Sequence, residues 1–277
     1  MNTTRRAFLA GGALAGLSLA VPTLAFGANS LAAVKANGKL RVGAAPADPW
    51  YYKDPISEEW AGVGVEIGKR MAEELGVEPV LVETTWPNSV AGIQADQIDV
   101  MFVLDPNEAR RKAIDFPDVP LFYYAMGALV PGDSSAKTWE DFNKDGFKVG
   151  VTLGTNVDTV LTEMLKNATF ERFASNDEAV AAFVARRVDM VSQFHPALIM
   201  QYSRIKIGKV ILPEEVYAIP TSVGVMKSDD PSFRDWVNDF ISKSYASGET
   251  QKIFETYLSS KGVDPTSVPG LMKERWA

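Results

Sequence analysis

Arg110 is the residue of this 277-residue chain whose setting points most directly to a chemistry. Its guanidinium presents paired N–H donors in one plane, and this geometry matches the two oxygens of a carboxylate. The apolar residues Val100–Leu104 precede it and predict a strand that is covered on both faces. A helix that follows such a strand begins at the carboxyl edge of the sheet, where open α/β proteins bind ligands. We therefore predict that Arg110 holds a small organic anion.

The residues just before Arg110 predict how that helix begins. Asp105 suits the N-cap, Pro106 suits the first helical position, and Glu108 completes a capping box. The first turns of the helix then carry Arg110 and Arg111. Asp105 is also a candidate for contact with the ligand, although the N-cap role alone accounts for it.

A second turn between a strand and a helix predicts further anion donors. Val149–Val151 predict the strand, and Gly154, Thr155 and Asn156 stand between it and a helix that carries apolar residues from Val157 onward. Backbone N–H groups at a helix start have no partner within the helix, and with the Thr155 hydroxyl they can complete an anion site. The same residues also suit an ordinary N-cap, and the two roles are compatible.

Aromatic side chains are candidates for the walls of this site. Trp50 and Tyr51 follow an apolar segment at Leu40–Gly43, and Trp86 stands further along the chain. Aromatic faces bury a large apolar area in a ligand pocket. Each of the three can instead pack between parts of the protein without touching a ligand.

Apolar and amphipathic segments alternate along the chain, which predicts doubly wound α/β layers. The predicted strands are residues 40–43, 80–82, 100–103, 148–151, 190–192 and 210–212. In addition, residues 97–101 (QIDVM) have an echo in residues 187–191 (RVDMV). Two similar α/β lobes would explain this echo.

The composition excludes several classes of site and partner. There is no cysteine, so no disulfide, iron–sulfur cluster or thiolate zinc site can form, and a single histidine excludes a multi-histidine metal site. The formal charge of -7 predicts an acidic surface, which argues against nucleic acid as a partner. We expect no metal and no other cofactor.

Residues 1–28 predict an export signal. Arg5 and Arg6 are followed by a run rich in alanine, glycine and leucine as far as Ala28, and this pattern resembles a twin-arginine signal peptide. A general secretory signal or an uncleaved anchor is the alternative, and the many small residues argue against an anchor. The cleavage position within residues 25–28 stays open. We expect the mature protein in the periplasm.

The segment around Arg110 also resembles that of a known family, the bacterial extracellular solute-binding proteins of family 3, which is the polar amino-acid-binding group. Their signature R-x5-F-[ST]-x-P-[YF] is similar to Arg110, Phe116, Pro120, Phe122, Tyr123 and Tyr124. Further similar stretches follow in the family's order at residues 40–43, 62–67, 86–98, 149–155 and 231–258. The resemblance spans nearly all of the chain after residue 35. It selects Arg110 as the binding arginine, through the spacing to Phe116, and leaves Arg111 to solvent.

The resemblance implies an α/β periplasmic binding protein of type II, with two lobes that are each a sheet flanked by helices. Lobe 1 is expected at residues 29–128 plus 228–277 and lobe 2 at residues 133–222, with hinges near 129–132 and 223–227. Such a protein closes its cleft on a carboxylate-bearing solute, an amino acid or a related organic acid. It then presents the closed form to the permease subunits of an ABC importer. We expect a monomer without enzymatic activity.

One feature of the sequence departs from the resembling family. Its members that bind α-amino acids usually have an aspartate for the ammonium group where this chain has Phe194, next to His195. Asp48, Glu66 or Asp105 are candidates to supply the missing negative charge. Alternatively, the ligand is a carboxylate without an α-amine that packs on Phe194, and His195 donates to a second acceptor. We favour a carboxylate-bearing solute and leave its amine open.

Rival functions come from other classes of protein. Some proteins of this type resemble cyclohexadienyl dehydratases, in which an acid in the cleft expels water from a bound carboxylated ring; Asp48, Glu66 or Asp105 would be that acid. A periplasmic partner of a redox enzyme and the input domain of a sensor are further alternatives. The sequence contains no nucleophilic triad and no phosphate loop, which argues against a hydrolase or a kinase.

Overall fold

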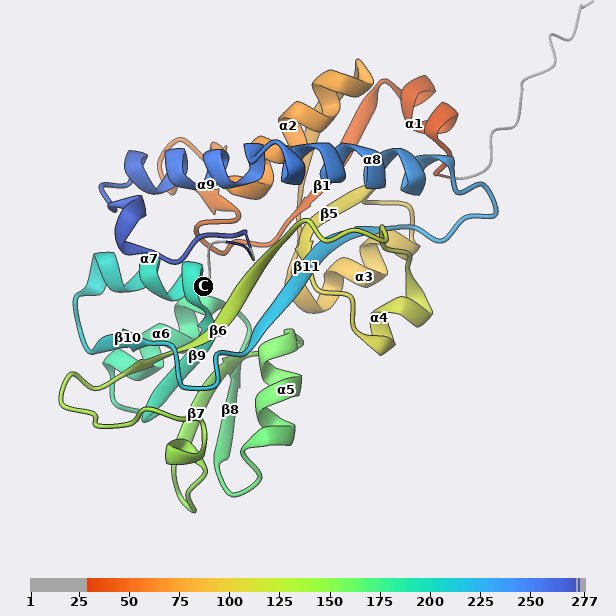
Figure 1. Ribbon diagram of the computed structural model, residues 1–277. Coiled ribbons are helices and arrows are strands. Elements are labelled where there is room, and N and C mark those ends of the chain that lie inside the picture. The colour runs from red at the N-terminus through yellow and green to blue at the C-terminus, as the bar shows by residue number, and fades with distance from the viewer. Residues whose placement is uncertain (1–28, 273, 275–277) are drawn as a thin grey trace, which may run out of the picture.

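Two lobes, each a group of strands flanked by helices, form the part of the chain that the computed structural model describes, residues 29–272 and 274 (Figure 1). The predicted signal at residues 1–28 lies outside the described residues. The strand order is β4-β1-β5-β11-β6-β9-β7-β8, and β10 pairs with β6. Among the described residues, no helix is long and apolar enough to cross a membrane. Helices and sheet alternate as the sequence predicted.

Lobe 1 contains a parallel core of three strands with an antiparallel neighbour. Its strands are β1 (Lys39–Ala44), β4 (Glu78–Glu83), β5 (Val100–Leu104) and β11 (Ala218–Val225), with a short hairpin of β2 (Tyr52–Lys53) and β3 (Trp60–Ala61). Its helices are α1 (Leu31–Asn37), α2 (Val63–Leu75), α3 (Trp86–Gln94), α4 (Glu108–Ala113), α8 (Ser232–Ala246) and α9 (Glu249–Ser260). Helix α2 packs on β1 and β4, α9 packs against α2, and α8 packs against α9 and α1.

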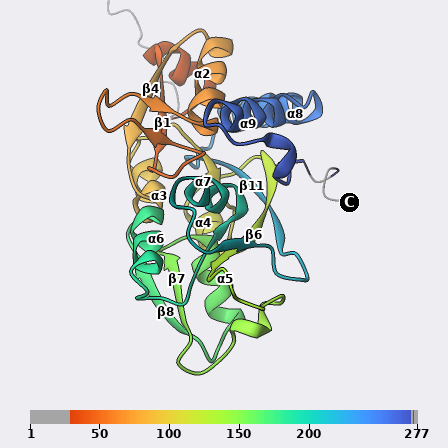
Figure 2. The same cartoon turned by 90° about the vertical axis from the view of Figure 1, so that its left-hand side faces the viewer.

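Lobe 2 repeats this plan. Its strands are β6 (Phe122–Val130), β7 (Lys148–Thr152), β8 (Thr169–Phe173), β9 (Met190–Phe194) and β10 (Lys209–Ile211). Its helices are α5 (Asn156–Met164), α6 (Asn176–Val184) and α7 (His195–Ile205), with a 3-10 turn at Glu140–Phe142. A second 3-10 turn, Pro265–Ser267, packs on α9 in lobe 1. Strand β7 is parallel to β8 and β9, whereas β6 is antiparallel to β9. Figure 2 shows β1 and β4 in one lobe and β7 and β8 in the other.

The echo in the sequence corresponds to the same structural device in both lobes. The Asp99 carboxylate accepts a hydrogen bond of 2.6 Å from the backbone N–H of Arg41, and the Asp99 N–H donates to the Arg41 carbonyl at 2.8 Å. Asp189 makes the same two bonds to Lys148, at 2.7 and 2.8 Å. Asp99, just before β5, thus fixes the first residues of β1, and Asp189, just before β9, fixes the start of β7.

Strands β6 and β11 connect the two lobes and run side by side between them (Figure 1). Residues 122–125 of β6 pair with residues 218–221 of β11. Beyond this ribbon, β6 pairs with β9 in lobe 2 and β11 pairs with β5 in lobe 1. The sequence predicts the hinges at residues 129–132 and 223–227. In each case the paired ribbon comes a few residues earlier in the sequence. The hinge positions therefore stay predictions.

Candidate functional site

A pocket lies where the two lobes meet, at the carboxyl ends of β5, β7 and β9. It is lined by Trp50, Trp86, Val103, Asp105 and Arg110 of lobe 1, by Tyr124 of the connecting ribbon, and by Thr152, Thr155, Asn156, Val157, Asn176, Ser192, Gln193, Phe194 and Ala197 of lobe 2. Its free volume is about 40 Å³, which is room for roughly three water-sized groups. The edge at which the sequence placed the site is therefore also the edge at which the pocket lies.

Arg110 enters the pocket from α4, but this helix begins differently from the prediction. Asn107 is the N-cap, and its side-chain oxygen accepts a bond of 2.9 Å from the Arg110 N–H. The prediction that Asp105 caps the helix, with Pro106 as the first helical residue, is wrong, because the Asp105 carboxylate binds Tyr124 instead. The chain makes a tight turn after Asp105, in which the Asn107 N–H donates to the Asp105 carbonyl at 3.1 Å, and Asn107 serves equally well as a cap.

The Arg110 guanidinium connects the two lobes. Its Nη1 donates to the Asp105 backbone carbonyl at 2.9 Å, and its Nη2 donates to the Gly154 carbonyl of lobe 2 at 3.0 Å. The side chain is buried, with 8% of the residue exposed. Burial lowers the pKa of Arg110 and the nearby Asp105 carboxylate raises it, yet a guanidinium stays protonated in proteins. By contrast, Arg111 is exposed and lies over the Phe116 ring at 5.5 Å.

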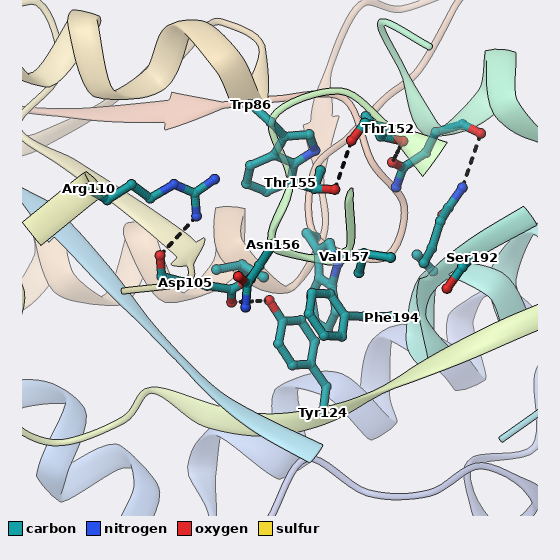
Figure 3. A pocket seen from close by; sticks show the side chains of 15 residues that line it. Trp86, Asp105, Arg110, Tyr124, Thr152, Thr155, Asn156, Val157, Ser192 and Phe194 are labelled. Atoms are coloured by element: carbon teal, nitrogen blue, oxygen red, sulfur yellow. Dashed lines mark hydrogen bonds between the residues drawn. The ribbon is translucent and has the colours of Figure 1, made fainter. Parts of the chain in front are cut away.

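Asp105 and Tyr124 form a buried pair beside this cation (Figure 3). The Tyr124 hydroxyl donates to Asp105 Oδ1 at 2.5 Å. Burial raises the pKa of Asp105, whereas Arg110 and the Tyr124 hydrogen bond lower it. Burial and the Asp105 charge keep the pKa of Tyr124 well above its usual value. The Tyr124 ring stacks on Phe194, with 3.6 Å between the ring centroids and 8° between the planes, so that Phe194 closes this end of the pocket.

The start of α5 supplies N–H donors from lobe 2. Thr155 is its N-cap, and the Thr155 hydroxyl accepts from the Asp158 N–H at 3.3 Å and donates to the Thr152 carbonyl at 2.8 Å. Because that hydroxyl proton already has an acceptor, the groups left for an anion are the backbone N–H groups of Asn156 and Val157. Both residues line the pocket.

Of the predicted aromatic residues, two line the pocket and one does not. Trp50 and Trp86 are lining residues, and Trp50 also stacks on Phe122 at 5.2 Å between centroids. Tyr51 is fully buried away from the pocket, where its hydroxyl donates to the Phe102 carbonyl at 3.0 Å. Trp50 and Trp86 are therefore the aromatic walls that the structure offers.

Asp48 and Glu66, the two other acids that the sequence offered, lie outside the pocket lining. Asp48 accepts a bond of 2.8 Å from the Tyr257 hydroxyl and one of 3.0 Å from Arg204 Nη1. Glu66 is half-exposed on α2 and pairs with Arg70 at 3.3 Å. Asp105 is thus the acid that the structure brings beside Arg110.

His195 also lies outside the pocket lining, although it follows Phe194 directly. Its Nδ1 accepts from the Ala125 N–H at 3.1 Å, which leaves Nε2 to donate to the Pro269 carbonyl at 3.1 Å. Burial lowers the pKa of His195 to about 4, although the bond to the Pro269 carbonyl raises it. This neutral imidazole ties the C-terminal segment to the start of α7 and to β6.

Four uncharged polar residues of the pocket were not predicted from the sequence: Thr152, Asn176, Ser192 and Gln193. They stand at the carboxyl ends of β7 and β9 and at the start of α6. The sequence predicted both strands, but it ended them at residues 151 and 192, short of the actual ends at Thr152 and Phe194. The signal available was therefore the common edge at which these strands end. Among the described residues, no group of three or more His, Asp or Glu side chains is arranged to hold a metal ion.

Comparison with known proteins gives a family match over most of the chain. Residues 40–260 match the family of bacterial extracellular solute-binding proteins, family 3. The L-arginine-binding protein of Pseudomonas aeruginosa is 26% identical over 183 residues, which cover 65% of this chain and 66% of the relative. A probable amino-acid ABC transporter periplasmic-binding protein of Sinorhizobium fredii is also 26% identical, over 63% of this chain and 60% of the relative. The chain thus spans less than two thirds of the length of these curated relatives.

Solved structures show the same fold. An ancestral amino acid-binding protein, described as a precursor of cyclohexadienyl dehydratase, is 28% identical with a TM-score of 0.74 and covers 82% of this chain and 98% of its own. A substrate-binding protein of an amino acid ABC transporter from Streptococcus pneumoniae, bound to L-arginine, is 24% identical with a TM-score of 0.76, over 83% of this chain and 98% of its own. These neighbours confirm the predicted type II periplasmic-binding fold.

Proposed function

The chain belongs to the bacterial extracellular solute-binding proteins of family 3, and from this premise we propose that it captures a small carboxylate-bearing solute for an ABC importer. The solute is an amino acid or a related organic acid. Members of the family are binding proteins of the periplasm. For this chain we propose export by the twin-arginine route, function as a monomer and delivery of the ligand to permease subunits.

The observation that carries this proposal is the buried guanidinium of Arg110. Two of its five N–H donors bond to backbone carbonyls, one in each lobe. The carboxylate of its neighbour Asp105 accepts a hydrogen bond from the Tyr124 hydroxyl. A ligand carboxylate is a stronger acceptor than a peptide carbonyl, and it can take the remaining donors in a paired geometry.

Closure of the cleft follows from the position of these donors in different lobes. Arg110 approaches from α4 of lobe 1, and the N–H groups of Asn156 and Val157 approach from α5 of lobe 2. A carboxylate bonded to both sets favours the closed form, since only that form brings both within reach. Micromolar affinity needs about -8.2 kcal/mol, which one charge-assisted pair, backbone bonds and contacts with Trp50 and Trp86 supply.

A dehydratase is the second candidate function, and the buried Asp105 is the observation that favours it. A carboxyl group whose pKa is raised by burial is suited to donate a proton to a leaving hydroxyl. We nevertheless propose binding without turnover, because the Asp105 carboxylate already accepts the Tyr124 hydroxyl and one similar ancestral structure is described as an amino acid-binding protein. Incubation with prephenate or arogenate separates the two, because a transport receptor releases both unchanged.

The test of the proposed function is a thermal-shift screen over amino acids, betaines and simple carboxylates, with mass spectrometry of any ligand that co-purifies. Wild type is compared with Arg110→Ala and with Arg111→Ala, the exposed neighbour on the same helix. We expect the ligand-induced shift to vanish in the Arg110 variant and to persist in the Arg111 variant. An unchanged shift in Arg110→Ala would remove the proposed carboxylate site.

A further inference from the structure

The pocket has a second polar end, which the proposed carboxylate site does not use. Four uncharged residues of lobe 2 form it, all less than a tenth exposed: Thr152, Asn176, Ser192 and Gln193. Most of their polar groups are bonded to one another or to the backbone. The Thr152 hydroxyl donates to Asn176 Oδ1 at 2.6 Å, and the Ser192 hydroxyl donates to the Gly127 carbonyl at 2.7 Å.

Gln193 is the exception in this group. Its Nε2 donates to the Asn176 carbonyl at 3.2 Å, whereas its Oε1 is buried without a hydrogen-bond partner among the described residues. Rotating the amide would place Oε1 against the Asn176 carbonyl oxygen, so the bond to Nε2 fixes the orientation. Gln193, 4% exposed, is therefore a lining residue of the pocket whose side chain carries a buried acceptor without a donor.

The charges of the pocket lie elsewhere. Arg110 and Asp105 are the charged residues among those that line it, and Figure 3 shows them on the side away from Thr152 and Ser192. A ligand cation beside Gln193 would be buried without an acid to balance it, which is unfavourable. An uncharged O–H or N–H group of the ligand can donate to Gln193 Oε1 without the cost of burying a charge.

The pocket also limits the size of the ligand. The free volume of about 40 Å³ is bounded on one side by the stacked rings of Tyr124 and Phe194. This small volume favours a ligand with a short carbon chain.

We infer that Gln193 accepts a hydrogen bond from an uncharged O–H or N–H group at the end of the ligand that lies away from its carboxylate. The ligand class is a compact monocarboxylate that ends in a hydroxyl or an amide, and a terminal ammonium is excluded. This inference rests on the proposed function, because the carboxylate at Arg110 fixes which way the ligand lies.

The test uses sets of acids that differ only in the terminal group. Serine, alanine and 2,3-diaminopropionate end in a hydroxyl, a methyl and an ammonium group, and 3-hydroxypropionate, propionate and β-alanine repeat the set without the α-amine. Their four-carbon homologues extend both sets. By titration calorimetry with the full mature chain, we expect the hydroxyl member to bind about tenfold tighter than the methyl member, and the ammonium member to bind most weakly. An ammonium member that binds as tightly as its hydroxyl counterpart overturns the inference.

Variants then assign the preference to one side chain. Gln193→Met keeps the length of the side chain and removes the acceptor, so the hydroxyl-over-methyl preference is expected to fall to about one. Gln201→Met is the matched control, since Gln201 is also a buried glutamine of lobe 2, bonded through Nε2 to Asp177 and outside the pocket. It is expected to keep the full preference. If Gln193→Met fails to fold, the wild-type comparison alone decides.

The outcomes separate this inference from the proposed function. If none of these acids binds but another carboxylate binds in an Arg110-dependent way, the inference about Gln193 fails and the proposed function stands. If no carboxylate binds at all, both fail. A hydroxyl preference that survives in Gln193→Met also overturns the role of Gln193.

Discussion

Arg204 in lobe 2 donates from Nη1 to the Asp48 carboxylate in lobe 1 across 3.0 Å. The same carboxylate accepts a bond of 2.8 Å from the Tyr257 hydroxyl of α9, so lobe 1 holds the acid in position for the arginine. Burial raises the pKa of Asp48, while Tyr257 and Arg204 lower it. Like the bond from Arg110 to the Gly154 carbonyl, this pair is a direct polar contact between the lobes.

Arg204→Met is expected to weaken ligand binding although Arg204 lies outside the pocket. Methionine keeps part of the apolar stem and removes the charge, so the closed form loses one contact between the lobes. Because Arg204 is half-exposed, the pair contributes only about 0.5 kcal/mol, and we expect a two- to threefold loss of affinity, mainly through faster dissociation. Stopped-flow dissociation rates with the identified ligand measure it.

Arg187→Met is the matched control for this prediction. Arg187 pairs with Glu171 inside lobe 2 at 2.5 Å, so its loss is expected to leave the dissociation rate unchanged. If both variants release the ligand at the same faster rate, the Asp48–Arg204 pair has no specific role in closure.

Tyr124→Phe is expected to destabilise the protein in a pH-dependent way. The variant leaves the buried Asp105 carboxylate without the Tyr124 donor, at a cost of about 1–3 kcal/mol. Burial already raises the pKa of Asp105 in the folded protein. The contribution of Asp105 to the free energy of unfolding is therefore fully present below its pKa in the unfolded chain, and it is lost as the pH rises through its pKa in the folded protein. Losing the donor raises the folded pKa further. Urea unfolding at pH 4 and pH 7 is therefore expected to show the larger penalty at pH 7.

Tyr51→Phe controls for the loss of a buried tyrosine hydroxyl as such. The Tyr51 hydroxyl donates to a backbone carbonyl, that of Phe102, and not to a carboxylate. Its loss is expected to cost about 1 kcal/mol at both pH values. Equal penalties for the two variants across the pH range would mean that the Asp105 charge is not involved.

The strands that the sequence predicted are those that carry a short, mainly apolar run. All six predicted strands are present in the structure. Strand β11 was not predicted, because Pro220 and Gly224 read as breakers, yet Pro220 lies within the ribbon, opposite Tyr123. Strand β8 was missed because Glu171 and Arg172 interrupt its apolar residues at the edge of the sheet.

Part of the candidate site was predictable from the types of side chain near strand ends. The other lining residues depend on contacts between residues that are distant in the sequence. Arg110 was found through the buried strand before it and its spacing to Phe116. The choice of Asn107 over Asp105 as N-cap depends on Tyr124, which lies on another strand. Gln193 gives no signal in the sequence, because only its bond to the Asn176 carbonyl orients its amide.

Gly64→Ala is expected to destabilise lobe 1. A Cβ at this position would lie 2.7 Å from the Tyr51 ring, which is fully buried and cannot move aside. Such overpacking costs about 1–3 kcal/mol, which a urea denaturation curve resolves as a lower midpoint. Gly132→Ala, where a Cβ meets nothing within 4 Å, is the control and is expected to be neutral or slightly stabilising. A neutral Gly64→Ala would mean that the start of α2 adjusts freely.

His195 is expected to titrate far below an ordinary histidine. Its pKa is about 4 in the folded protein and about 6.5 in the unfolded chain. Because the folded value is depressed, the contribution to stability is fully present above the unfolded value and is lost as pH falls from about 6.5 to about 4; it amounts to roughly 3 kcal/mol. The chain contains one histidine, so the imidazole protons give a single set of NMR signals to follow. A midpoint near 6.5 would mean that the imidazole is not buried in solution, whereas His195→Gln is expected to flatten the stability profile between these pH values.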